Sequence, residues 1–308
     1  MRMLRNALFS AGLAIAVSQA GCVVGKTVDA LVSTPRAVPN KLTNPARSDA
    51  RLALTWIGHA TTLVQMDDTF ILTDPVFTKS VGELSARLVE PGLAPENLPH
   101  VNVVLISHLH FDHLSLDSLD RIEDEVDRLY VPKGGLAYVP DYRFETNELG
   151  WWQSVELGGM KITAVKVKHN GMRYAVDAGW MKTSFTGYVV EYHGLTVYYA
   201  GDTAFDREDF VETAARFPNI DLAILPIGPI QPRAIMESMH EDPQEAFAAF
   251  DLLRAKYMIP IHYETFINSV DGPHDSRNAF DALVKERHDE NRAFRLEIGQ
   301  QKVLIAKD

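Results

Sequence analysis

Four side chains that can bind metal ions occur within six residues of the segment VNVVLISHLHFDHL (101–114): His108, His110, Asp112 and His113. In an extended chain, side chains two residues apart point to the same side, so His108 and His110 can converge on one ion. Asp112 and His113 follow where a turn into a helix would direct them toward a second ion. Imidazole nitrogens and carboxylate oxygens are zinc ligands, so the spacing predicts a binuclear site with hydrolytic chemistry.

Further candidate ligands stand directly after other expected strands: His169 after 161–168, Asp202 after 195–200 and His262 after 256–261. The apolar run 101–106, before the first motif, is typical of a strand buried on both faces. Strand ends that meet at one sheet edge would bring these groups together. We expect one ion on His108, His110 and His169, a second on Asp112, His113 and His262, and Asp202 as the bridge.

Three further polar residues are candidates for supporting roles. His59 follows the expected strand 52–57 and is either a substrate contact or a turn residue. Asp74 follows strand 70–73, and we expect it to orient a ligand as an outer acceptor rather than to bind metal itself. His240 precedes the expected helix 242–255 and is either a phosphate contact or proton donor, or a helix cap. His193, His274 and His288 receive no role.

The remaining pattern predicts an α/β fold in which strands alternate with helices. Helices are expected over 116–126, 206–217, 242–255 and 276–287, and a closing hairpin over 294–298 and 302–305. The long connection 77–100 favours a lid or binding loop. Its apolar residues have helical spacing, which predicts a short amphipathic helix for core packing or for lipid entry. The spaced residues are Val81, Leu84 and Leu88.

The amino-acid composition limits the kinds of partner that the protein can bind. The chain has 308 residues, 46% of them hydrophobic and 23% charged, which is ordinary for a globular protein. Its formal net charge of -11 argues against nucleic acid as the main partner, because binding to a phosphate backbone needs a basic face. The single cysteine, Cys22, excludes an intrachain disulfide.

The N-terminus is similar to a bacterial lipoprotein signal. Arg2 and Arg5 precede an apolar stretch, 7–17, which is too short to span a membrane. Residues 1–21 are then a signal peptide and Cys22 is the lipidated first residue, although a secretory signal with an incidental cysteine remains an alternative. We expect a bacterial cell-envelope protein, lipid-anchored on the periplasmic side of the outer membrane, or else a secreted or periplasmic one. Residues 22–50 form a tether or strap, and 51–308 the hydrolase domain.

The ordered motifs resemble those of the metallo-β-lactamase-fold superfamily across residues 51–308. They are H-x-H-x-D-H, His169, Gly-Asp-Thr at 201–203 and the strand-end His262. Segments 56–61, 72–75, 239–246 and 261–266 are similar to the branch containing N-acyl-phosphatidylethanolamine-hydrolysing phospholipase D and, more distantly, ascorbate-6-phosphate lactonase. This resemblance implies a four-layer αββα sandwich with two Zn²⁺ ions at the edge of its sheets. It also implies the bridging role of Asp202.

The expected function is therefore a zinc-dependent phosphodiesterase of phospholipase D type that uses a metal-bridging hydroxide on N-acyl-phosphatidylethanolamine-like lipids. Asp112, His240 and His59 are the residues expected at the reacting atoms. Other divalent metals are possible. Lactone or ester hydrolysis and a non-enzymatic metal-binding envelope lipoprotein stay open as alternatives. Asn170-Gly171 and Tyr263-Glu264 depart from the phospholipase pattern beside the expected ligands, which leaves the substrate open.

Overall fold

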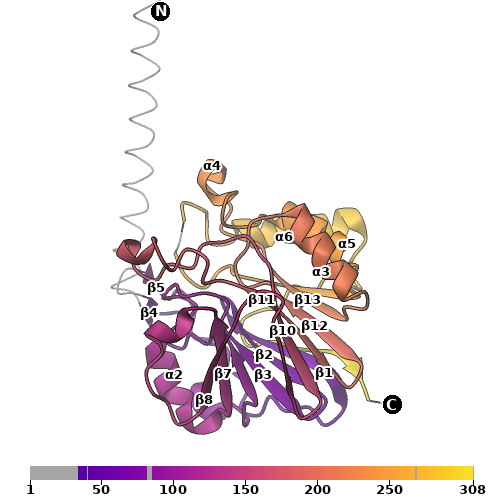
Figure 1. The fold of residues 1–308 in the computed structure, drawn as a ribbon. Helices are drawn as coiled ribbons and strands as arrows, with labels where there is room; N and C mark the ends of the chain where they lie inside the picture. Colours follow the sequence, from indigo (N-terminus) through magenta and orange to yellow (C-terminus); the bar gives the residue numbers. More distant parts are fainter. Residues whose placement is uncertain (1–33, 40, 82–84, 268, 308) are drawn as a thin grey trace, which may run out of the picture.

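Two β-sheets packed face to face form the centre of the molecule, and helices cover their outer faces (Figure 1). The computed structural model describes residues 34–39, 41–81, 85–267 and 269–307. The signal peptide and the lipidation of Cys22 lie outside the described residues, so both stay predictions.

The first sheet is mixed and has seven strands. Its first four strands, β15 to β3, pair antiparallel, and its last four, β3 to β8, pair parallel. Across the sheet the strands are β15 (Gln301–Ala306), β1 (Ala50–Gly58), β2 (Thr61–Met66), β3 (Thr69–Thr73), β6 (Val103–Leu105), β7 (Arg128–Pro132) and β8 (Glu145–Leu149).

The second sheet has six strands, of which β12, β13 and β14 are parallel and the others antiparallel. Across the sheet they are β14 (Tyr257–Ile261), β13 (Leu222–Pro226), β12 (Leu195–Tyr199), β11 (Gly187–Tyr192), β10 (Met160–Val165) and β9 (Ser154–Leu157). A separate two-stranded pair consists of β4 (Ser80–Val81) and β5 (Ser85–Ala86).

Helix α2 (Leu116–Ile122) lies against the first sheet, and α3 (Arg207–Arg216), α5 (Pro243–Leu253) and α6 (Asp275–Arg287) lie against the second (Figure 1). The short α4 (Arg233–Met236) projects from the sandwich. Four 3₁₀ turns complete the described elements: η1 (Pro95–Asn97), η2 (Glu123–Glu125), η3 (Gly135–Tyr138) and η4 (Ala175–Asp177). The layers confirm the predicted αββα architecture.

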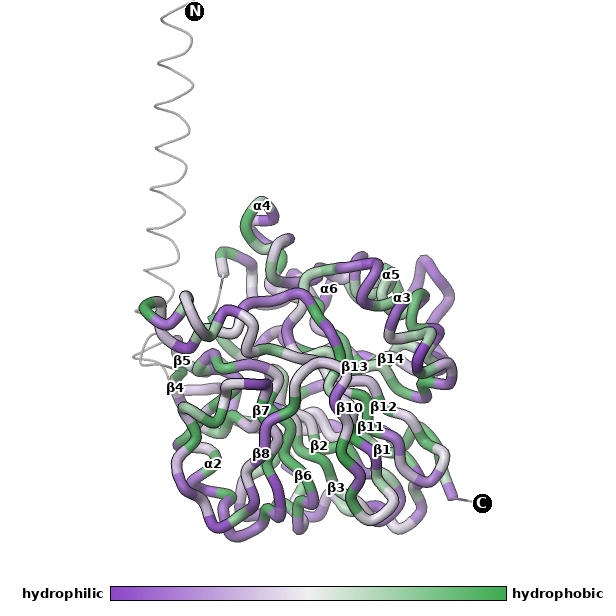
Figure 2. Tube along the Cα trace, viewed as in Figure 1, coloured by the Kyte–Doolittle hydropathy of each residue, from purple (hydrophilic) through white to green (hydrophobic). Residues whose placement is uncertain are grey.

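Alternation along β6 explains why the first sheet is buried on both faces. Val103 and Leu105 pack into the core between the two sheets, whereas Val104 and Ile106 pack into a second core beneath α2. Successive side chains of a strand point to opposite faces, so a continuous apolar run fits a strand between two layers. Hydrophobic colouring accordingly follows the central strands of both sheets (Figure 2).

Strand direction decides where the polar strand ends gather. Strands β1, β3 and β6 of the first sheet run the same way, because β1 and β3 both pair antiparallel with β2 and β6 is parallel to β3. By the same reasoning β10, β12 and β14 share a direction in the second sheet. The residues that follow these six strands meet at one edge of the sandwich and include all the predicted metal ligands.

The expected helix over 81–88 is wrong. Residues on either side of the undescribed 82–84 form the antiparallel pair β4 and β5. Arg87 is buried, donates to the carbonyls of Val76 and Thr78, and forms an isolated bridge with Phe266. These long-range contacts fit the extended residues 80–81 and 85–86, which override the helical spacing of the apolar residues.

The expected closing hairpin is also wrong. Strand β15 pairs with β1, where Lys302 lies opposite Leu54. The segment 294–298 instead begins beside β14, where the Phe294 amide donates to the Met258 carbonyl over 2.9 Å. Two apolar runs separated by a turn predict a hairpin, but here each run finds its partner elsewhere in the chain.

Trp56 packs against residues at the strand ends, and its replacement tests the packing there. Its side chain is fully buried, its ring stacks on Tyr263 with centroids 4.3 Å apart, and its Nε1 donates to the His59 carbonyl over 2.9 Å. We expect Trp56→Ala to lower the free energy of unfolding by about 3–5 kcal/mol, because it leaves a large cavity. Trp56→Phe should lose less. Urea denaturation measures both, and a loss below about 1 kcal/mol for the alanine variant would contradict this packing.

Candidate metal centre

A tight turn places the H-x-H-x-D-H motif between β6 and α2. The amides of His113 and Leu114 both donate to the His110 carbonyl, over 3.1 and 2.9 Å. This turn ends the extended segment after His110 and redirects Asp112 and His113. The motif thus contributes to two neighbouring groups of side chains, as its spacing predicts.

The first group contains His108, His110 and His169, the three residues expected to share one ion. Nε2 of His108 lies 2.8 Å from Nδ1 of His110, which in turn lies 3.5 Å from Nε2 of His169. Burial lowers the pKa of His110 and brings those of His108 and His169 well below their ordinary value. All three imidazoles are therefore neutral at pH 7, the state in which imidazole binds a metal ion.

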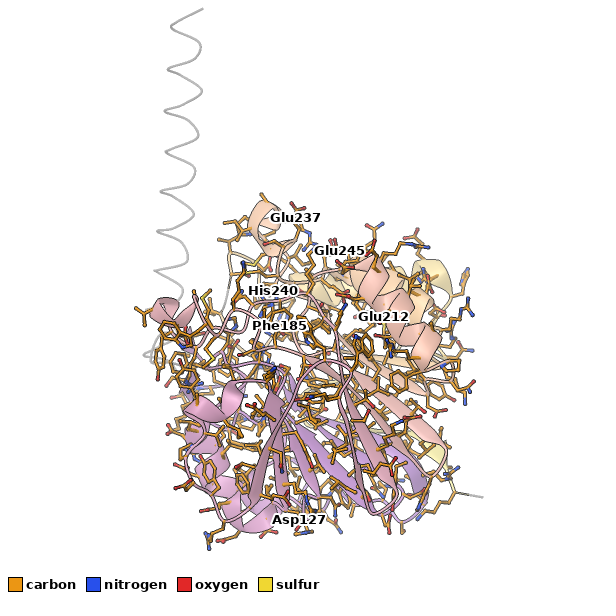
Figure 3. All side chains as sticks on the ribbon, viewed as in Figure 1. Asp127, Phe185, Glu212, Glu237, His240 and Glu245 are labelled. Carbon is orange, nitrogen blue, oxygen red and sulfur yellow. The ribbon has the colours of Figure 1, made fainter. Side chains whose placement is uncertain are left out.

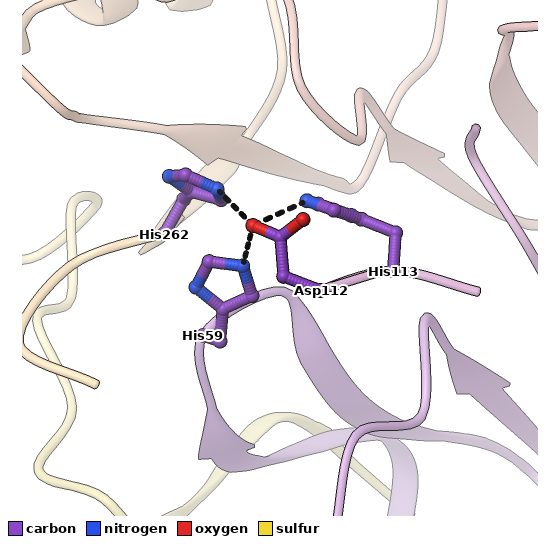
Figure 4. A group of neighbouring side chains, drawn as sticks. All are labelled: His59, Asp112, His113 and His262. Carbon is purple, nitrogen blue, oxygen red and sulfur yellow. Dashed lines mark hydrogen bonds and ion pairs between the residues drawn. The ribbon is translucent and has the colours of Figure 1, made fainter. Parts of the chain in front are cut away.

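The second group contains Asp112, His113 and His262, together with His59 (Figure 4). Oδ2 of Asp112 lies 3.1 Å from Nε2 of His59, 3.8 Å from Nε2 of His113 and 3.9 Å from Nε2 of His262. The structure thus brings together the three predicted ligands of the second ion. It also adds His59, which the sequence suggested only as a substrate or turn residue.

Asp202 contacts the second group and influences the first. Its Oδ2 lies 3.1 Å from Nε2 of His262 and 3.2 Å from Nε2 of His113. Its negative charge also raises the pKa of His108 and His169, against the stronger effect of their burial. A carboxylate in this position suits the bridging role expected for it.

Gly201 lets Asp202 approach the motif. The glycine has φ of 63°, and a Cβ at this position would lie 2.2 Å from Cβ of Ser107. Only glycine fits both the left-handed backbone and this close approach. The Gly-Asp-Thr sequence therefore places the carboxylate where the end of β12 meets the loop that follows β6.

The outward ring nitrogens of the candidate ligands are held in place. Each faces an oxygen atom of the surrounding shell, so the opposite nitrogen points inward with a defined orientation. The pairs are His108 Nδ1 with Ser107 Oγ (2.9 Å), His110 Nε2 with Asn170 Oδ1 (3.0 Å), His113 Nδ1 with Asp74 Oδ2 (2.5 Å), His169 Nδ1 with the Met239 carbonyl (2.9 Å) and His262 Nδ1 with the Gly228 carbonyl (2.9 Å).

The inward atoms fit metal ions. Nε2 of His113, Nε2 of His262 and Oδ1 of Asp202 are buried and make no hydrogen bond within the described part of the chain. Buried polar atoms without partners are costly, and bound cations would satisfy them. The donor set of nitrogen and carboxylate oxygen is suited to zinc and related divalent ions.

Charge at the centre is balanced through His113. Burial alone would lower the pKa of His113, but Asp202, Asp74 and Asp112 raise it well above its ordinary value. Burial likewise opposes ionisation of Asp112 and Asp202, yet the charge of His113 holds the pKa of both well below the ordinary value. Without cations, His113 therefore carries a proton among the carboxylates, and binding of a metal ion would displace it.

Asp74 lies behind the two ligand groups, where its carboxylate forms a further candidate group with His108 and His113, at the position expected of an orienting acceptor. Its buried carboxylate accepts from the backbone amide of Ser107 (2.7 Å), the hydroxyl of Ser107 (2.6 Å) and the hydroxyl of Tyr199 (2.5 Å), in addition to His113. Ser107, Tyr199 and Asn170 are supporting residues that sequence reasoning missed. Ser107 and Asn170 were visible beside the ligands, whereas nothing in the sequence pointed to Tyr199.

Replacement of Asp74 tests this orienting role. Asp74→Asn retains the shape but removes the charge that faces His113, and we expect zinc affinity to fall by about 10–100-fold. Competition with a chromophoric chelator measures the affinity. The matched variant Asp117→Asn, at an exposed position on α2, should bind zinc as the wild type does. Unchanged zinc affinity in Asp74→Asn would show that metal binding does not depend on a carboxylate beside Nδ1 of His113.

His240 and His59 both reach the centre. Nδ1 of His240 is buried, makes no hydrogen bond with any described residue and lies 3.6 Å from Oδ2 of Asp202. Burial, together with neighbouring His262, lowers the pKa of His240 to about 4, against the opposing charge of Asp202. The capping alternative for His240 is wrong, because Asp242 is the N-cap of α5. His59 lies in a turn, with φ of 56°, and its ring contacts Asp112; the turn interpretation therefore holds, and its role as a substrate contact stays a prediction.

His193, His274 and His288, which received no role, lie away from the centre. His193 contacts Asp67 in a turn, His274 contacts Glu264, and His288 is the C-cap of α6. None of them belongs to the candidate metal-binding groups of the described residues.

The fold and these ligand groups define a metallo-β-lactamase-type centre, and the comparisons agree. Residues 69–263 match the family model of the beta-lactamase superfamily domain, so the chain belongs to this superfamily. The family resemblance inferred from the motifs is thereby confirmed.

Curated relatives place the chain near the predicted branch. It is 32% identical over 247 residues to N-acyl-phosphatidylethanolamine-hydrolyzing phospholipase D 1 of Caenorhabditis elegans, covering 74% of this chain and 68% of that protein. It is 28% identical to the mitochondrial enzyme of that name from Saccharomyces cerevisiae, of which the chain spans 48%. A UPF0173 metal-dependent hydrolase of Pyrobaculum islandicum is 28% identical over 244 residues, covering 76% of this chain and 94% of that protein.

Solved structures show the same fold at lower identity. The isothiocyanate hydrolase from Delia radicum gut bacteria superposes with a TM-score of 0.66 at 17% identity, covering 83% of this chain and 100% of the other. The metallo hydrolase Igni18 from Ignicoccus hospitalis gives 0.60 at 21% identity, covering 82% and 97%. Together with the ligand groups, the relatives support a metal-dependent hydrolase of the metallo-β-lactamase superfamily.

Proposed function

We propose that the protein is a dizinc phosphodiesterase of phospholipase D type that cleaves N-acyl-phosphatidylethanolamine-like lipids. The observation that carries the proposal is a pair of neighbouring ligand groups, with the carboxylate of Asp202 in contact with His113 and His262 of the second group. The 32% identity to a phospholipase D of that specificity, over most of the chain, supports the choice of substrate.

The donor atoms suit two zinc ions. His108, His110 and His169 offer three neutral imidazoles, a common zinc ligand set. The second group combines the carboxylate of Asp112 with the imidazoles of His113 and His262, and His59 lies beside them. When bound, the ions would supply a water of lowered pKa and positive charge close to the oxygens of the substrate. Other divalent ions with the same ligand preferences remain compatible with these donors.

The chain's own residues account for orientation and proton transfer. Hydrolysis forms a bond between a water oxygen and phosphorus, breaks the bond from phosphorus to the N-acylethanolamine oxygen, and places a proton on that leaving oxygen. His240 is the additional inward-facing group beside Asp202 and is assigned to the phosphate oxygens or to this proton. His59 holds Asp112 in position through its 3.1 Å contact.

The residues that left the substrate open have structural explanations. A Cβ at Gly171 would lie 2.3 Å from the Ser184 carbonyl oxygen, so glycine is required there. Tyr263 stacks on Trp56 and donates to the Leu296 carbonyl over 2.9 Å. Gly171 and Tyr263 therefore serve packing beside the centre, and neither favours a lactone over a phosphodiester.

A substrate panel tests the proposal. Purified, zinc-loaded protein is assayed with an N-acyl phosphatidylethanolamine, a chromogenic phosphodiester and an acyl lactone. We expect turnover of both phosphodiesters and release of N-acylethanolamine from the lipid. Activity on the lactone alone would replace the proposal with carbon-centred hydrolysis. Full metal binding without turnover of any substrate would favour the non-enzymatic alternative.

A further inference from the structure

Large apolar side chains on the surface gather near the metal centre. Among the described residues, those most exposed are Tyr174 (47%), Val176 (81%), Trp180 (66%), Val211 (44%) and Ile235 (55%). All but Val211 lie on the segment 172–183 or on α4, both of which project at the end of the sandwich that carries the ligands (Figure 1). Apolar groups concentrated in this way mark an interaction surface rather than chance exposure.

Both projections are joined directly to the centre. The segment follows His169 and returns at Phe185, which forms an isolated bridge with His108. At the end of α4, the His240 amide donates to the Met236 carbonyl over 2.7 Å. Figure 3 accordingly shows Phe185 and His240 near each other beneath α4, with Asp127 at the opposite end of the molecule.

Buried hydrogen bonds anchor the segment 172–183, whereas the apolar side chains of Tyr174, Val176 and Trp180 are exposed to solvent. Arg173 is buried, and its Nη1 donates to the carbonyls of Leu109 (2.9 Å), within the metal-binding motif, and Leu114 (2.8 Å), directly after it. Asp177 is also buried and accepts from the amide of Arg173 and the hydroxyl of Tyr138. These contacts satisfy the buried polar groups and hold Val176 and the neighbouring apolar side chains away from the core.

We propose that Tyr174, Val176, Trp180 and Ile235 form a lipid-facing surface that rests in the outer layer of a membrane and aligns the metal centre with its substrate. The proposal rests on the proposed function, because a lipid substrate must be reached within a bilayer. Tryptophan and tyrosine favour the membrane interface, since each joins an apolar ring to a polar edge. Among the described residues, no helix has the length and apolar character of a membrane span.

Charge and chain direction favour a lipid over a protein partner. The net charge of -11 disfavours strongly anionic surfaces, so a zwitterionic bilayer is the expected partner. The described chain begins at Thr34, and the backbone of Arg36 pairs with residues 88–90. The amide of Leu88 in turn donates to the carbonyl of Thr265, just beyond His262. Cys22 lies twelve residues before Thr34, a reach of roughly 40 Å when extended. A lipid on Cys22 would therefore hold this end toward the membrane.

Tryptophan quenching tests the contact without relying on catalysis. The full chain is mixed with vesicles of phosphatidylcholine brominated on its acyl chains, which quench only tryptophans that enter the bilayer. We expect clear quenching in the wild type and in Trp152→Phe, and its loss in Trp180→Phe. Quenching that persists in Trp180→Phe would overturn the proposal, because contact would then occur elsewhere.

Enzyme kinetics, together with the mass of the protein in solution, provide the second measurement. For the double variant Val176→Ser and Trp180→Ser, the ratio of turnover on vesicle lipid to turnover on a soluble phosphodiester should fall about tenfold. The matched control Val211→Ser, on α3, should retain the wild-type ratio. An unchanged ratio, or a wild-type dimer that the double variant converts to a monomer, would overturn the lipid-facing surface. Trp180-dependent quenching without phosphodiesterase activity would instead retain the surface and refute the proposed function.

Discussion

Replacement of His108 by alanine is expected to reduce metal-dependent turnover by about a thousandfold or more. His108 is buried, faces His110 and His169 through Nε2, and has its other nitrogen 2.9 Å from Ser107. Its loss would remove one of the three ligands proposed for the first ion and would leave a cavity beside the second group. Metal analysis of the same preparation should show less than the wild-type zinc content.

His288→Ala is the matched control for this experiment. His288 is the C-cap of α6 and lies outside the ligand groups. The control should keep both zinc content and turnover, with at most a small loss of helix stability. Turnover by His108→Ala close to that of His288→Ala would show that the first histidine group takes no part in the reaction.

Replacement of Asp202 by asparagine should have a larger effect on metal content than loss of any single histidine. The carboxylate lies 3.1–3.2 Å from ring nitrogens of His113 and His262 and influences the pKa of His108 across the centre. An amide of the same shape cannot supply the negative charge that two neighbouring cations require. We expect affinity for both ions to fall and turnover to drop by at least about a thousandfold.

Isothermal titration with zinc measures this coupling between the ions. Asp141→Asn, an exposed carboxylate distant from the ligand groups in sequence, serves as the control and should titrate as the wild type does. Loss of only one binding event in Asp202→Asn, with the other at wild-type affinity, would refute a bridging role. Asp202 would then belong to a single ion.

The ligand groups were predictable because they depend on strand ends. Apolar runs identified the strands, and strands of one direction end at one edge, so His169, Asp202 and His262 had to lie near the motif. Asp74 was predictable for the same reason, since it follows β3 directly. Local patterns therefore determined most of the centre although its residues are far apart in the sequence.

Features that depend on long-range contacts were not predictable. Backbone carbonyls of Met239 and Gly228 orient two histidines, and a carbonyl carries no signature in the sequence. Burial of Arg87 against Phe266 replaced an expected helix by an extended segment. The segment 172–183, which carries most of the proposed lipid-facing surface, was likewise missed, because the sequence pointed elsewhere for lipid contact and gave no sign that Arg173 holds this segment in place.

The most direct test of the account is anomalous scattering from crystals of the zinc-loaded protein, recorded on both sides of the zinc absorption edge. The account predicts two peaks about 3.5–4 Å apart, one beside His108, His110 and His169 and the other beside Asp112, His113 and His262, with Asp202 reaching both. A single peak, or two peaks without Asp202 between them, would contradict it.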